Sequence, residues 1–360
     1  MRIRSRSLAL VAATLVLGVL ASACGSSSNN SSDPTVAPGA DGTAASAKPA
    51  TLNLGYLPNV THAPAIYGIQ TGDFATALGS NVTLKTSSFN SGTDAVTALL
   101  SGAIDGSFLG PGPATSAFTK GKGDFVVVAG LASGGAFLVT KPSITKAADL
   151  KGKKISDPQL GNTQDIALRW YLKQQGFTTD TSGGGDVHVV PQDNSQTVTA
   201  FQSGDIDGAW VPEPYATKLI AEGGKVLVNE ADLWPNKQFV TTVLVMNKTY
   251  LKDHAEVVKN LLTATLASID KASSDASGFA TAVAAGITKA AGKEFKASLV
   301  TDSIKSITFQ LDPVASSLLT VADHAVALKL QDKSDLSGIF DLGIVNQVLQ
   351  AAGKPAVTGS

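Results

Sequence analysis

Two stretches of the chain share one pattern and decide the fold: residues 96–106 read VTALLSGAIDG and residues 198–208 read VTAFQSGDIDG. A shift of 102 positions lays residues 90–115 over residues 192–217 with ten identities and no gap. Each copy predicts a helix, a Ser-Gly stop, a strand, a proline-containing loop and a second helix, because glycine favours the position just after a helix. We infer two lobes built on one plan. Chance similarity of two βα units is the alternative, because the turn residues are common ones.

The residues around the first copy follow the same rhythm of short apolar runs and helical patterns. Strands are expected at residues 52–57, 82–89, 104–109 and 125–131, and helices at residues 63–70, 94–100 and 114–118. Gly102 fits the position that follows a helix. Alternating strands and helices of this kind predict an α/β fold with helices on both faces of the sheet.

The composition is that of a globular chain with a large core. Of the 360 residues, 43% are hydrophobic and 16% are charged, and the net charge is −1. Residues 51–360 are enough for one large or two medium domains. Because no stretch forms a basic stripe, we expect no nucleic-acid partner.

The N-terminus predicts an export signal over residues 1–23. Three arginines stand within the first six residues, and an apolar run of 13 residues follows at 8–20. That run is too short for a membrane-spanning helix, which needs about 20 apolar residues. Small residues then lead to Cys24, the single cysteine of the chain.

The segment that ends at Cys24, Ala-Ser-Ala-Cys, resembles a bacterial lipobox, in which the cysteine carries two acyl chains. We therefore expect a lipoprotein held at the extracytoplasmic face of the cell membrane, because buried acyl chains anchor a soluble domain there. An ordinary signal with an incidental cysteine is the alternative. Residues 24–50 hold almost nothing to bury, so they are interpreted as a disordered tether.

A ligand site is expected in the loops where strands end and helices begin, which is where open α/β sheets bind small molecules. These loops hold hydroxyls, amides and glycines but no lysine or arginine. Helix N-termini offer free N–H groups and a partial positive charge, so several of them can hold an anion together. Simple helix capping is the alternative for each residue. The candidate ligand-binding residues are Asn59, Thr61, His62, Ser91, Gly92, Thr93, Gly110, Gly112, Asn162, Thr163, Trp210 and Glu213.

Three of these candidates carry their own alternatives. Glu213, if it faces the cleft, favours a zwitterion such as taurine, but it also suits the start of the following helix. Trp210 stacks on a ligand or lies in the core. His62 donates a hydrogen bond to an anion, or it is a cap or surface residue.

An ordered set of motifs resembles the nitrate/sulfonate/taurine family of solute-binding proteins of ABC importers. The resemblance covers about residues 51–355. Its motifs are GYLP at 55–58, FNSG at 89–92, the Gly-Pro repeat at 110–113, DLKGKK at 149–154, GAWVPEPY at 208–215, FQLDP at 309–313 and GIFDL at 338–342. It implies a two-lobed, type II periplasmic-binding-protein-like fold with a cleft between the lobes.

The resemblance also implies the domain boundaries and the partners. The first lobe would comprise residues 51–138 and, after a return strand, residues 241–360 with the C-terminal helices; the second lobe would comprise residues 139–240. A monomer would close on a small-molecule solute by hinge motion and dock on a permease that works with an ATPase.

Within this family, we expect the ligand to be an aliphatic sulfonate or taurine, although one sequence feature departs from the sulfonate binders. Many sulfonate binders of the family carry a Gln-Lys pair after the first strand, whereas Pro58 and Asn59 stand here, so the positive charge is missing. Nitrate, bicarbonate and a pyrimidine precursor of thiamine are the alternatives, because related scaffolds bind them.

An enzyme on the same fold is the alternative of another class. The four histidines lack the spacing of an HExxH metal motif, and the sequence shows no nucleophile-elbow or P-loop motif. We therefore expect a binding protein without a cofactor or a metal, not an enzyme.

Overall fold

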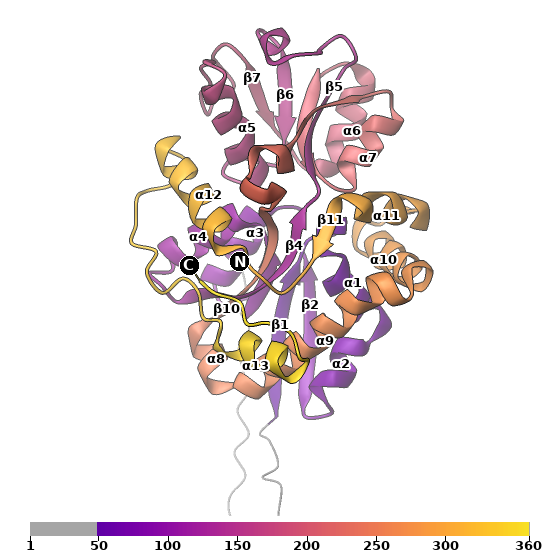
Figure 1. Ribbon diagram of the computed structural model, residues 1–360, viewed down its shortest axis with the longest axis vertical. Helices are drawn as coiled ribbons and strands as arrows, with labels where there is room; N and C mark the ends of the chain where they lie inside the picture. Colours follow the sequence, from indigo (N-terminus) through magenta and orange to yellow (C-terminus); the bar gives the residue numbers. More distant parts are fainter. Residues whose placement is uncertain (1–48, 360) are drawn as a thin grey trace, which may run out of the picture. The chain divides into compact units, whose positions relative to one another are not determined.

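A computed structural model describes residues 49–359 (Figure 1). The expected signal peptide, Cys24 and most of the expected tether lie outside the described residues. Within them, no helix combines the length and the apolar character that crossing a membrane requires. Residues 49–359 belong to one compact unit.

The first lobe is built on a six-stranded sheet in the order β11-β4-β10-β3-β1-β2. Strands β1, β2 and β3 run parallel, and β10 and β11 are antiparallel to their neighbours. The bounds are β1 (Ala50–Tyr56), β2 (Val82–Ser88), β3 (Gly106–Leu109), β4 (Phe125–Gly134), β10 (Val240–Asn247) and β11 (Ile307–Phe309).

The second lobe is built on a five-stranded sheet in the order β7-β6-β8-β5-β9. Its strands are β5 (Ala136–Thr140), β6 (Lys154–Asp157), β7 (His188–Pro191), β8 (Gly208–Pro212) and β9 (Lys225–Asn229). Three of them are parallel, and β5 is antiparallel to both of its neighbours. The order matches β2-β1-β3-β10-β4 of the first sheet position by position, so both lobes follow one plan. The two-lobed α/β fold expected from the sequence is confirmed.

The repeated Ser-Gly stop ends one helix in each lobe in the same way. Helix α3 (Gly92–Leu100) ends before Gly102, which has a φ of 74°, and α6 (Asn194–Ser203) ends before Gly204, which has a φ of 84°. Only glycine adopts such a left-handed conformation without strain. In both lobes the next residue donates its N–H back across the last turn, from Ala103 to the Ala98 carbonyl and from Asp205 to the Ala200 carbonyl, each at 2.9 Å.

The repeated aspartate, which follows the Ser-Gly stop, forms a hydrogen bond to the neighbouring parallel strand. The Oδ2 of Asp105 accepts a hydrogen bond from the Asn53 N–H of β1 at 2.7 Å, and the Oδ2 of Asp207 accepts one from the Lys154 N–H of β6 at 2.9 Å. Both carboxylates satisfy a backbone donor where the strand begins to pair. The shared motif therefore fixes how each α-to-β connection joins its sheet.

The glycine that follows the aspartate opens room for the antiparallel strand. A Cβ built on Gly106 would collide with Met246 of β10, and one built on Gly208 would lie 2.7 Å from the Val139 carbonyl oxygen of β5. Close backbone approach therefore explains the last residue of the motif in both copies.

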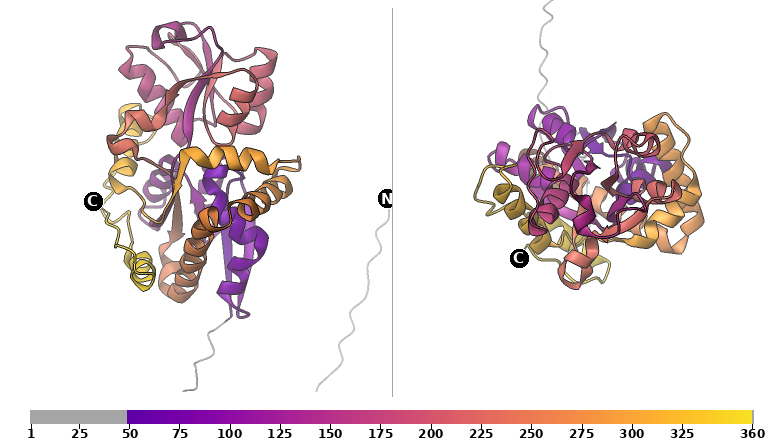
Figure 2. Two further views of the ribbon diagram at one scale, coloured as in Figure 1. Left: turned by 45° about the vertical axis from the view of Figure 1, so that its right-hand side comes forward. Right: turned by 90° about the horizontal axis from the view of Figure 1, so that it is seen from above.

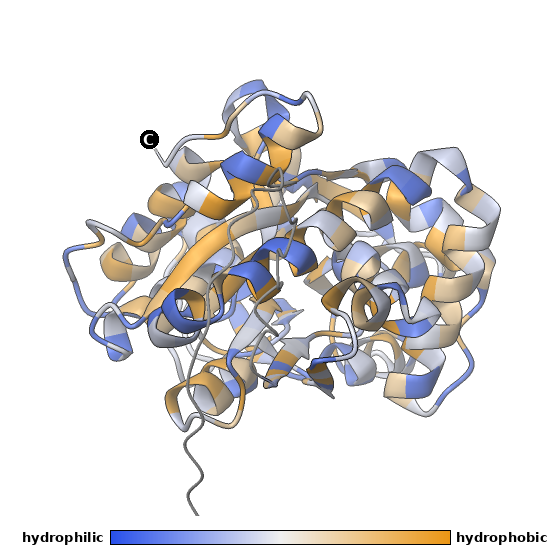
Figure 3. Cartoon of the chain, turned by 90° about the horizontal axis from the view of Figure 1, so that it is seen from below, coloured by the Kyte–Doolittle hydropathy of each residue, from blue (hydrophilic) through white to orange (hydrophobic). Residues whose placement is uncertain are grey.

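The remaining helices cover the sheets and alternate apolar inner faces with polar outer faces, as the hydropathy colours of Figure 3 show. In chain order they are α1 (Ala63–Thr71), α2 (Asp73–Leu78), α4 (Pro111–Lys120), α5 (Thr163–Gln174), α7 (Tyr215–Ala221), α8 (Lys248–Asp253), α9 (Ala255–Ser274), α10 (Ala276–Ala291), α11 (Ala297–Ser303), α12 (Ala315–Ala327) and α13 (Gly343–Ala351). Helix α2 is the one α-helix between β1 and β4 that the rhythm of the sequence did not predict. It follows Gly72, whose φ of 82° breaks the helical path after α1.

The C-terminal helices pack mostly against elements of the first lobe. Helices α9 and α10, orange in Figures 1 and 2, lie beside α1, and α9 also packs on α2. Two later helices reach the second lobe: α11 contacts α7, and α12 packs on both α4 and α5. The chain enters the second sheet at Ala136 and re-enters the first at Val240. The lobe boundaries expected from the sequence stay a prediction, although all of β5 lies in the second sheet.

Candidate ligand site

Loops from both lobes surround a small cavity of about 30 Å³. That volume holds about two water-sized spheres. The cavity is lined by Leu57, Asn59, Thr61, His62, Asn90, Ser91, Gly92, Gly110, Pro158, Asn162, Thr163, Gln164, Asn194, Pro212 and Thr241. We call it the donor cavity, because most of the polar side chains in it can donate hydrogen bonds.

Eight of the twelve candidate residues line the donor cavity: Asn59, Thr61, His62, Ser91, Gly92, Gly110, Asn162 and Thr163. They come from the starts of α1, α3, α4 and α5, and from η1 (Val60–His62), the short helix before α1. The convergence of these loops follows from the topology, because parallel strands end at the same edge of their sheet. Their role as ligand-binding residues stays a prediction.

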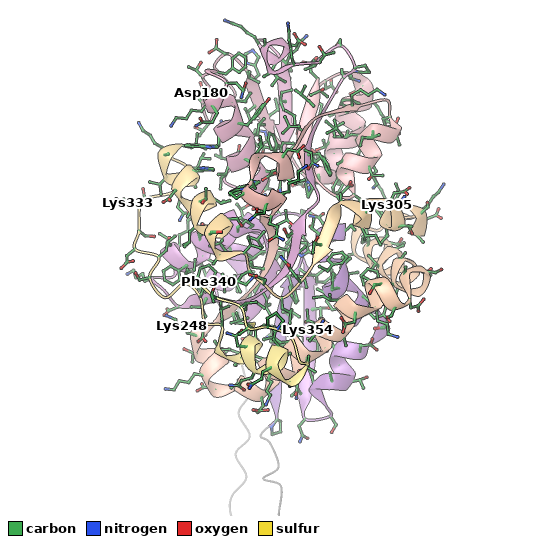
Figure 4. All side chains as sticks on the ribbon, in the orientation of Figure 1. Asp180, Lys248, Lys305, Lys333, Phe340 and Lys354 are labelled. Carbon is green, nitrogen blue, oxygen red and sulfur yellow. The ribbon has the colours of Figure 1, made fainter. Side chains whose placement is uncertain are left out.

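No aspartate, glutamate, lysine or arginine lines the donor cavity. Figure 4 labels charged side chains such as Lys305 and Lys333, which lie at the edges of the view. The one titratable group in the cavity is His62, which is only 2% exposed. Burial lowers the pKa of His62 to about 3, so its imidazole is neutral at physiological pH.

The tautomer of His62 follows from one backbone contact. The Leu57 N–H donates a hydrogen bond to the Nδ1 of His62 at 3.4 Å. A ring nitrogen that accepts carries no proton, so the proton of the neutral ring is assigned to Nε2. The Nε2–H group of His62 is therefore a neutral donor, in addition to the amides and hydroxyls of the cavity.

Two asparagines at the cavity leave helix N-termini uncapped. Asn162 precedes α5 and Asn59 precedes η1, and neither side chain bonds a backbone N–H of the helix that it precedes. Ser91 differs, because its Oγ accepts the Asp94 N–H at 3.2 Å as a normal N-cap. Uncapped N–H groups at a helix start are available to an anion.

One acceptor in the cavity has no partner. The Oδ1 of Asn194, the first residue of α6, is buried and makes no hydrogen bond to any of residues 49–359. A buried acceptor without a partner costs free energy. A ligand that carries a donor, such as an ammonium or a hydroxyl group, would satisfy it.

The lobes touch directly beside the cavity. The Thr93 Oγ1 of the first lobe donates to the Gln159 Oε1 of the second at 2.6 Å, and the Gly112 N–H donates to the Thr163 Oγ1 at 3.3 Å. Thr93 and Gly112 therefore join the lobes and do not line the cavity. The structure shows the lobes closed on each other.

Two glycines make this close contact possible. A Cβ built on Gly110 would collide with the Oγ1 of Thr163, and one built on Gly92 would lie 2.9 Å from the Oδ1 of Asn162. The Cβ on Gly110 would project into the second lobe, whereas the Cβ on Gly92 would also collide with Pro113 of its own lobe. The absence of a side chain at position 110 is therefore a requirement of the closed form.

Glu213 does not line the donor cavity. Its Oε2 accepts the Thr217 N–H at 3.0 Å, its Oε1 accepts the Thr217 hydroxyl at 2.9 Å, and the Ser303 hydroxyl donates to it at 3.2 Å. The carboxylate thus caps the start of α7, as the alternative in the sequence analysis has it. Burial raises the pKa of Glu213, against these hydrogen bonds. Glu213 therefore does not face the donor cavity in this conformation, because the Thr217 N–H and the hydroxyls of Thr217 and Ser303 hold its carboxylate.

Trp210 also lies away from the donor cavity. It is fully buried in β8, and its Nε1 donates to the Oε2 of Glu230 at 2.7 Å. Its ring packs against Tyr171 with 5.6 Å between ring centroids. The side chain packs with Leu138 and Leu168, whereas its strand neighbours Ala209 and Val211 belong to another core cluster, because side chains alternate along a strand. Trp210 therefore lies in the core and does not line the donor cavity.

Sequence reasoning missed seven residues of the lining: Leu57, Asn90, Pro158, Gln164, Asn194, Pro212 and Thr241. Two of them had a signal in the repeat. The shift of 102 positions that aligns the lobes carries Gly92 onto Asn194 and Gly110 onto Pro212. Thr241 had none, because it reaches the site on the return strand β10.

The fold and the cavity between its lobes define a two-lobed binding protein. The chain belongs to the NMT1-like family, whose model matches residues 45–288. Among curated relatives, a binding protein of Brucella abortus is 29% identical over 229 residues, which are 59% of this chain and 69% of that protein. The taurine-binding periplasmic protein of Escherichia coli is 32% identical over 181 residues, which are 50% of this chain and 54% of that protein.

Solved structures show the same fold at low identity. The alkanesulfonate-binding protein SsuA of Xanthomonas axonopodis pv. citri, bound to MOPS, superposes with a TM-score of 0.68 at 19% identity and covers 82% of this chain and 100% of its own. The periplasmic nitrate-binding protein NrtA of Synechocystis PCC 6803 superposes with a TM-score of 0.71 at 16% identity and covers 85% of this chain and 89% of its own.

Proposed function

We propose that this chain is the extracytoplasmic solute-binding protein of an ABC importer. It captures a small anionic or zwitterionic solute between its lobes and delivers the solute to a permease that works with an ATPase. Membership of the family, the names of the curated relatives and the two-lobed fold support the class of protein. The donor cavity supports the class of solute.

The single observation that carries the proposal is a cavity of neutral donors shared by both lobes. An anion in it accepts hydrogen bonds from Asn162 and Thr163 of the second lobe and from His62 of the first. A ligand in the cavity therefore links the two lobes by hydrogen bonds, and these bonds form only when the lobes are closed. A solute that bonds to both lobes favours the closed form over the open one.

The preferred solute is an aliphatic sulfonate or taurine. A sulfonate group presents three oxygens to the donors, and the ammonium of taurine would satisfy the free Oδ1 of Asn194. Nitrate or bicarbonate is the second candidate, because a cavity of about 30 Å³ suits a small planar ion. Ethanesulfonate and taurine are both larger than two water-sized spheres, so the lobes would close on either of them less tightly than in this structure.

We also propose that Cys24 is acylated and that the protein is thereby held at the outer face of the membrane after export. The basis is the sequence around Cys24 alone. Metabolic labelling with a radioactive fatty acid tests it. The natural chain should be labelled and a Cys24→Ser variant should not. Label in the variant would contradict acylation at Cys24.

The test of the proposed function is thermal unfolding of the purified chain with ethanesulfonate, taurine, nitrate, bicarbonate, sulfate and a hydroxymethylpyrimidine. A ligand at a hundredfold excess over its dissociation constant stabilises by about 2.7 kcal/mol, which raises the midpoint by a few degrees. A shift with ethanesulfonate or taurine is expected, and an Asn162→Ala variant should lose it. A shift with the pyrimidine alone, or with none of the compounds, would contradict the proposed solute class.

A further inference from the structure

The three tryptophans of the chain all line one second cavity of about 450 Å³. Its lining consists of Ala167, Trp170, Tyr171, Gln174, Gln175, Trp210, Glu230, Leu233, Trp234, Pro235, Thr320 and His324. We call it the tryptophan cavity. None of these residues lines the donor cavity. Its volume lies within the range of about 300–1,000 Å³ that is typical of small-molecule sites.

The walls come from both lobes. Trp170 belongs to α5 and Trp210 to β8, whereas His324 belongs to α12, which follows β11 of the first sheet. Glu230 begins η3 (Glu230–Leu233), and Trp234 stands between η3 and η4 (Pro235–Lys237), on the path back to the first lobe. Figure 1 shows α12 beside this path.

Aromatic contacts hold the walls in place. The rings of Trp170 and His324 stack with 3.9 Å between centroids and 13° between planes. Trp234 stacks on Phe239 with 5.8 Å between centroids and 8° between planes. The stacking partner covers one face of each indole, and because the rings are already fixed, a ligand that contacts the rest of their surface pays a lower entropic cost on binding.

The tryptophan cavity has one acidic side chain and no lysine or arginine in its lining. Glu230 is only 1% exposed, and the Trp210 Nε1 donates to it at 2.7 Å. Burial raises the pKa of Glu230 to about 7, although hydrogen bonds from Trp210 and Trp234 oppose the rise. Burial also lowers the pKa of His324, which favours its neutral form.

No cation pairs with Glu230 among residues 49–359. A buried carboxylate without a counter-charge is costly to ionise. Lys173 contacts Trp170, with its Nζ 5.3 Å from the ring centroid, but it is not part of the lining. The cavity is therefore lined by aromatic rings and one carboxylate, and its lining contains no positively charged side chain that could neutralise the carboxylate.

We propose that the tryptophan cavity is a second binding site, which takes an organic cation with methyl groups or a flat ring, such as a quaternary ammonium compound. Tryptophan faces attract such cations through their ring quadrupole, and most strongly where water is excluded. Glu230 supplies the counter-charge. Because α5 and α12 both form the wall, an occupant contacts both lobes and is sensitive to their closure.

The test is calorimetric titration of the full chain with choline, with intrinsic tryptophan fluorescence as a second readout. The matched control is the neutral analogue in which a tert-butyl group replaces the trimethylammonium group. Choline should bind at least about tenfold more tightly than this analogue, because charge and not shape alone is recognised. Equal binding of both compounds, or no binding of choline, would overturn the proposal.

Two variants assign the binding to this cavity. Glu230→Gln keeps an acceptor for the Trp210 N–H and removes the charge, so it should weaken choline about tenfold and leave the neutral analogue unchanged. Ala167→Leu fills part of the cavity without a change of charge and should weaken both compounds. An Asn162→Ala variant of the donor cavity should bind choline as the natural chain does. Choline binding that both cavity variants leave intact would place the cation elsewhere and refute the proposal.

Discussion

The donor cavity and the tryptophan cavity lie between the same lobes and have opposite chemistry. The donor cavity is small, has no charged side chain and is lined by amides, hydroxyls and one neutral imidazole. The tryptophan cavity is larger and aromatic, and it holds one buried carboxylate. On our proposals the neutral donors of the first cavity favour an anion, and the carboxylate of the second, which no cation pairs among residues 49–359, favours a cation.

The largest expected effect concerns the closed form at the donor cavity. Gly110→Ala places a methyl group against the Thr163 Oγ1, so the lobes cannot meet at their present distance. We expect the affinity for the anion to fall about a hundredfold, which corresponds to about 2.7 kcal/mol. Calorimetric titration measures the loss. The choline affinity should fall less, because the tryptophan cavity lies outside this contact.

A glycine elsewhere gives the matched control for that variant. A Cβ built on Gly343, at the start of α13, meets only one atom, at 3.7 Å. Gly343→Ala should therefore leave both affinities unchanged. If Gly110→Ala bound the anion as tightly as the Gly343→Ala control, the contact between Gly110 and Thr163 would not limit closure.

The next effect concerns pH at the tryptophan cavity. Glu230 must be ionised to attract a cation, and its pKa of about 7 means that protons compete with choline below neutral pH. Affinity should fall as the pH drops through 7 and then level off about tenfold lower, at the affinity expected of Glu230→Gln. The other titratable groups of the lining are His324 from α12 and Tyr171 from α5, and neither is anionic in this range. Titrations between pH 5 and 8 measure the trend, and it should vanish in Glu230→Gln. A trend that survives in this variant would assign the pH dependence to another group.

The donor cavity has a pH signature of its own in the free energy of unfolding. The pKa of His62 is about 3 in the folded state and near 6.5 in the unfolded state, so only the unfolded state binds a proton between these values. The contribution of His62 to stability is complete above pH 6.5 and is lost as the pH falls, by roughly 1.4 kcal/mol for each pH unit. Denaturant titrations without ligand measure it.

His62→Asn is the variant that isolates this contribution. The amide oxygen of asparagine can replace Nδ1 as the acceptor for the Leu57 N–H, and it does not titrate. The difference in unfolding free energy between the variant and the natural chain should grow as the pH falls from 6.5. Parallel pH profiles would show that His62 is accessible to protons in the folded state.

The smallest expected effect concerns Glu213. Its carboxylate caps α7, so Glu213→Gln should lower the unfolding free energy by about 1 kcal/mol. The affinity for taurine should stay within about twofold of that of the natural chain, because the side chain does not line the donor cavity. A selective loss of taurine affinity, with ethanesulfonate binding unchanged, would place Glu213 at the ligand after all.

The repeated motif explains why so much of the fold could be predicted from the sequence. The glycines, the aspartates and the apolar runs act locally or on the adjacent strand, so their spacing alone determines two equivalent lobes. Helix α2 escaped because it is six residues long and follows a glycine break directly after α1. Short helices of this kind depend on packing more than on their own sequence.

The sequence predicted the site residues whose position depends on the backbone topology. It did not predict those whose position depends on the direction of a side chain. Asn59, Ser91, Asn162 and Thr163 stand at strand-to-helix loops, so topology brings them together. Trp210 stands beside such a loop, yet its side chain packs in the core beside Leu168 of α5. There its Nε1 donates a hydrogen bond to Glu230, 20 residues further along the chain. The spacing of Trp210 and Glu230 in the sequence does not predict this contact, and the sequence therefore did not predict the tryptophan cavity.

The most direct test of the central claim is a crystal structure of the chain with the anion that stabilises it in the thermal screen. The anion should lie in the donor cavity, with its oxygens within hydrogen-bond distance of Asn162 and Thr163 from one lobe and of His62 from the other. No lysine or arginine should contact it. An anion bound outside this cavity, or neutralised by a basic side chain, would contradict the claim that neutral donors of two closed lobes hold the solute.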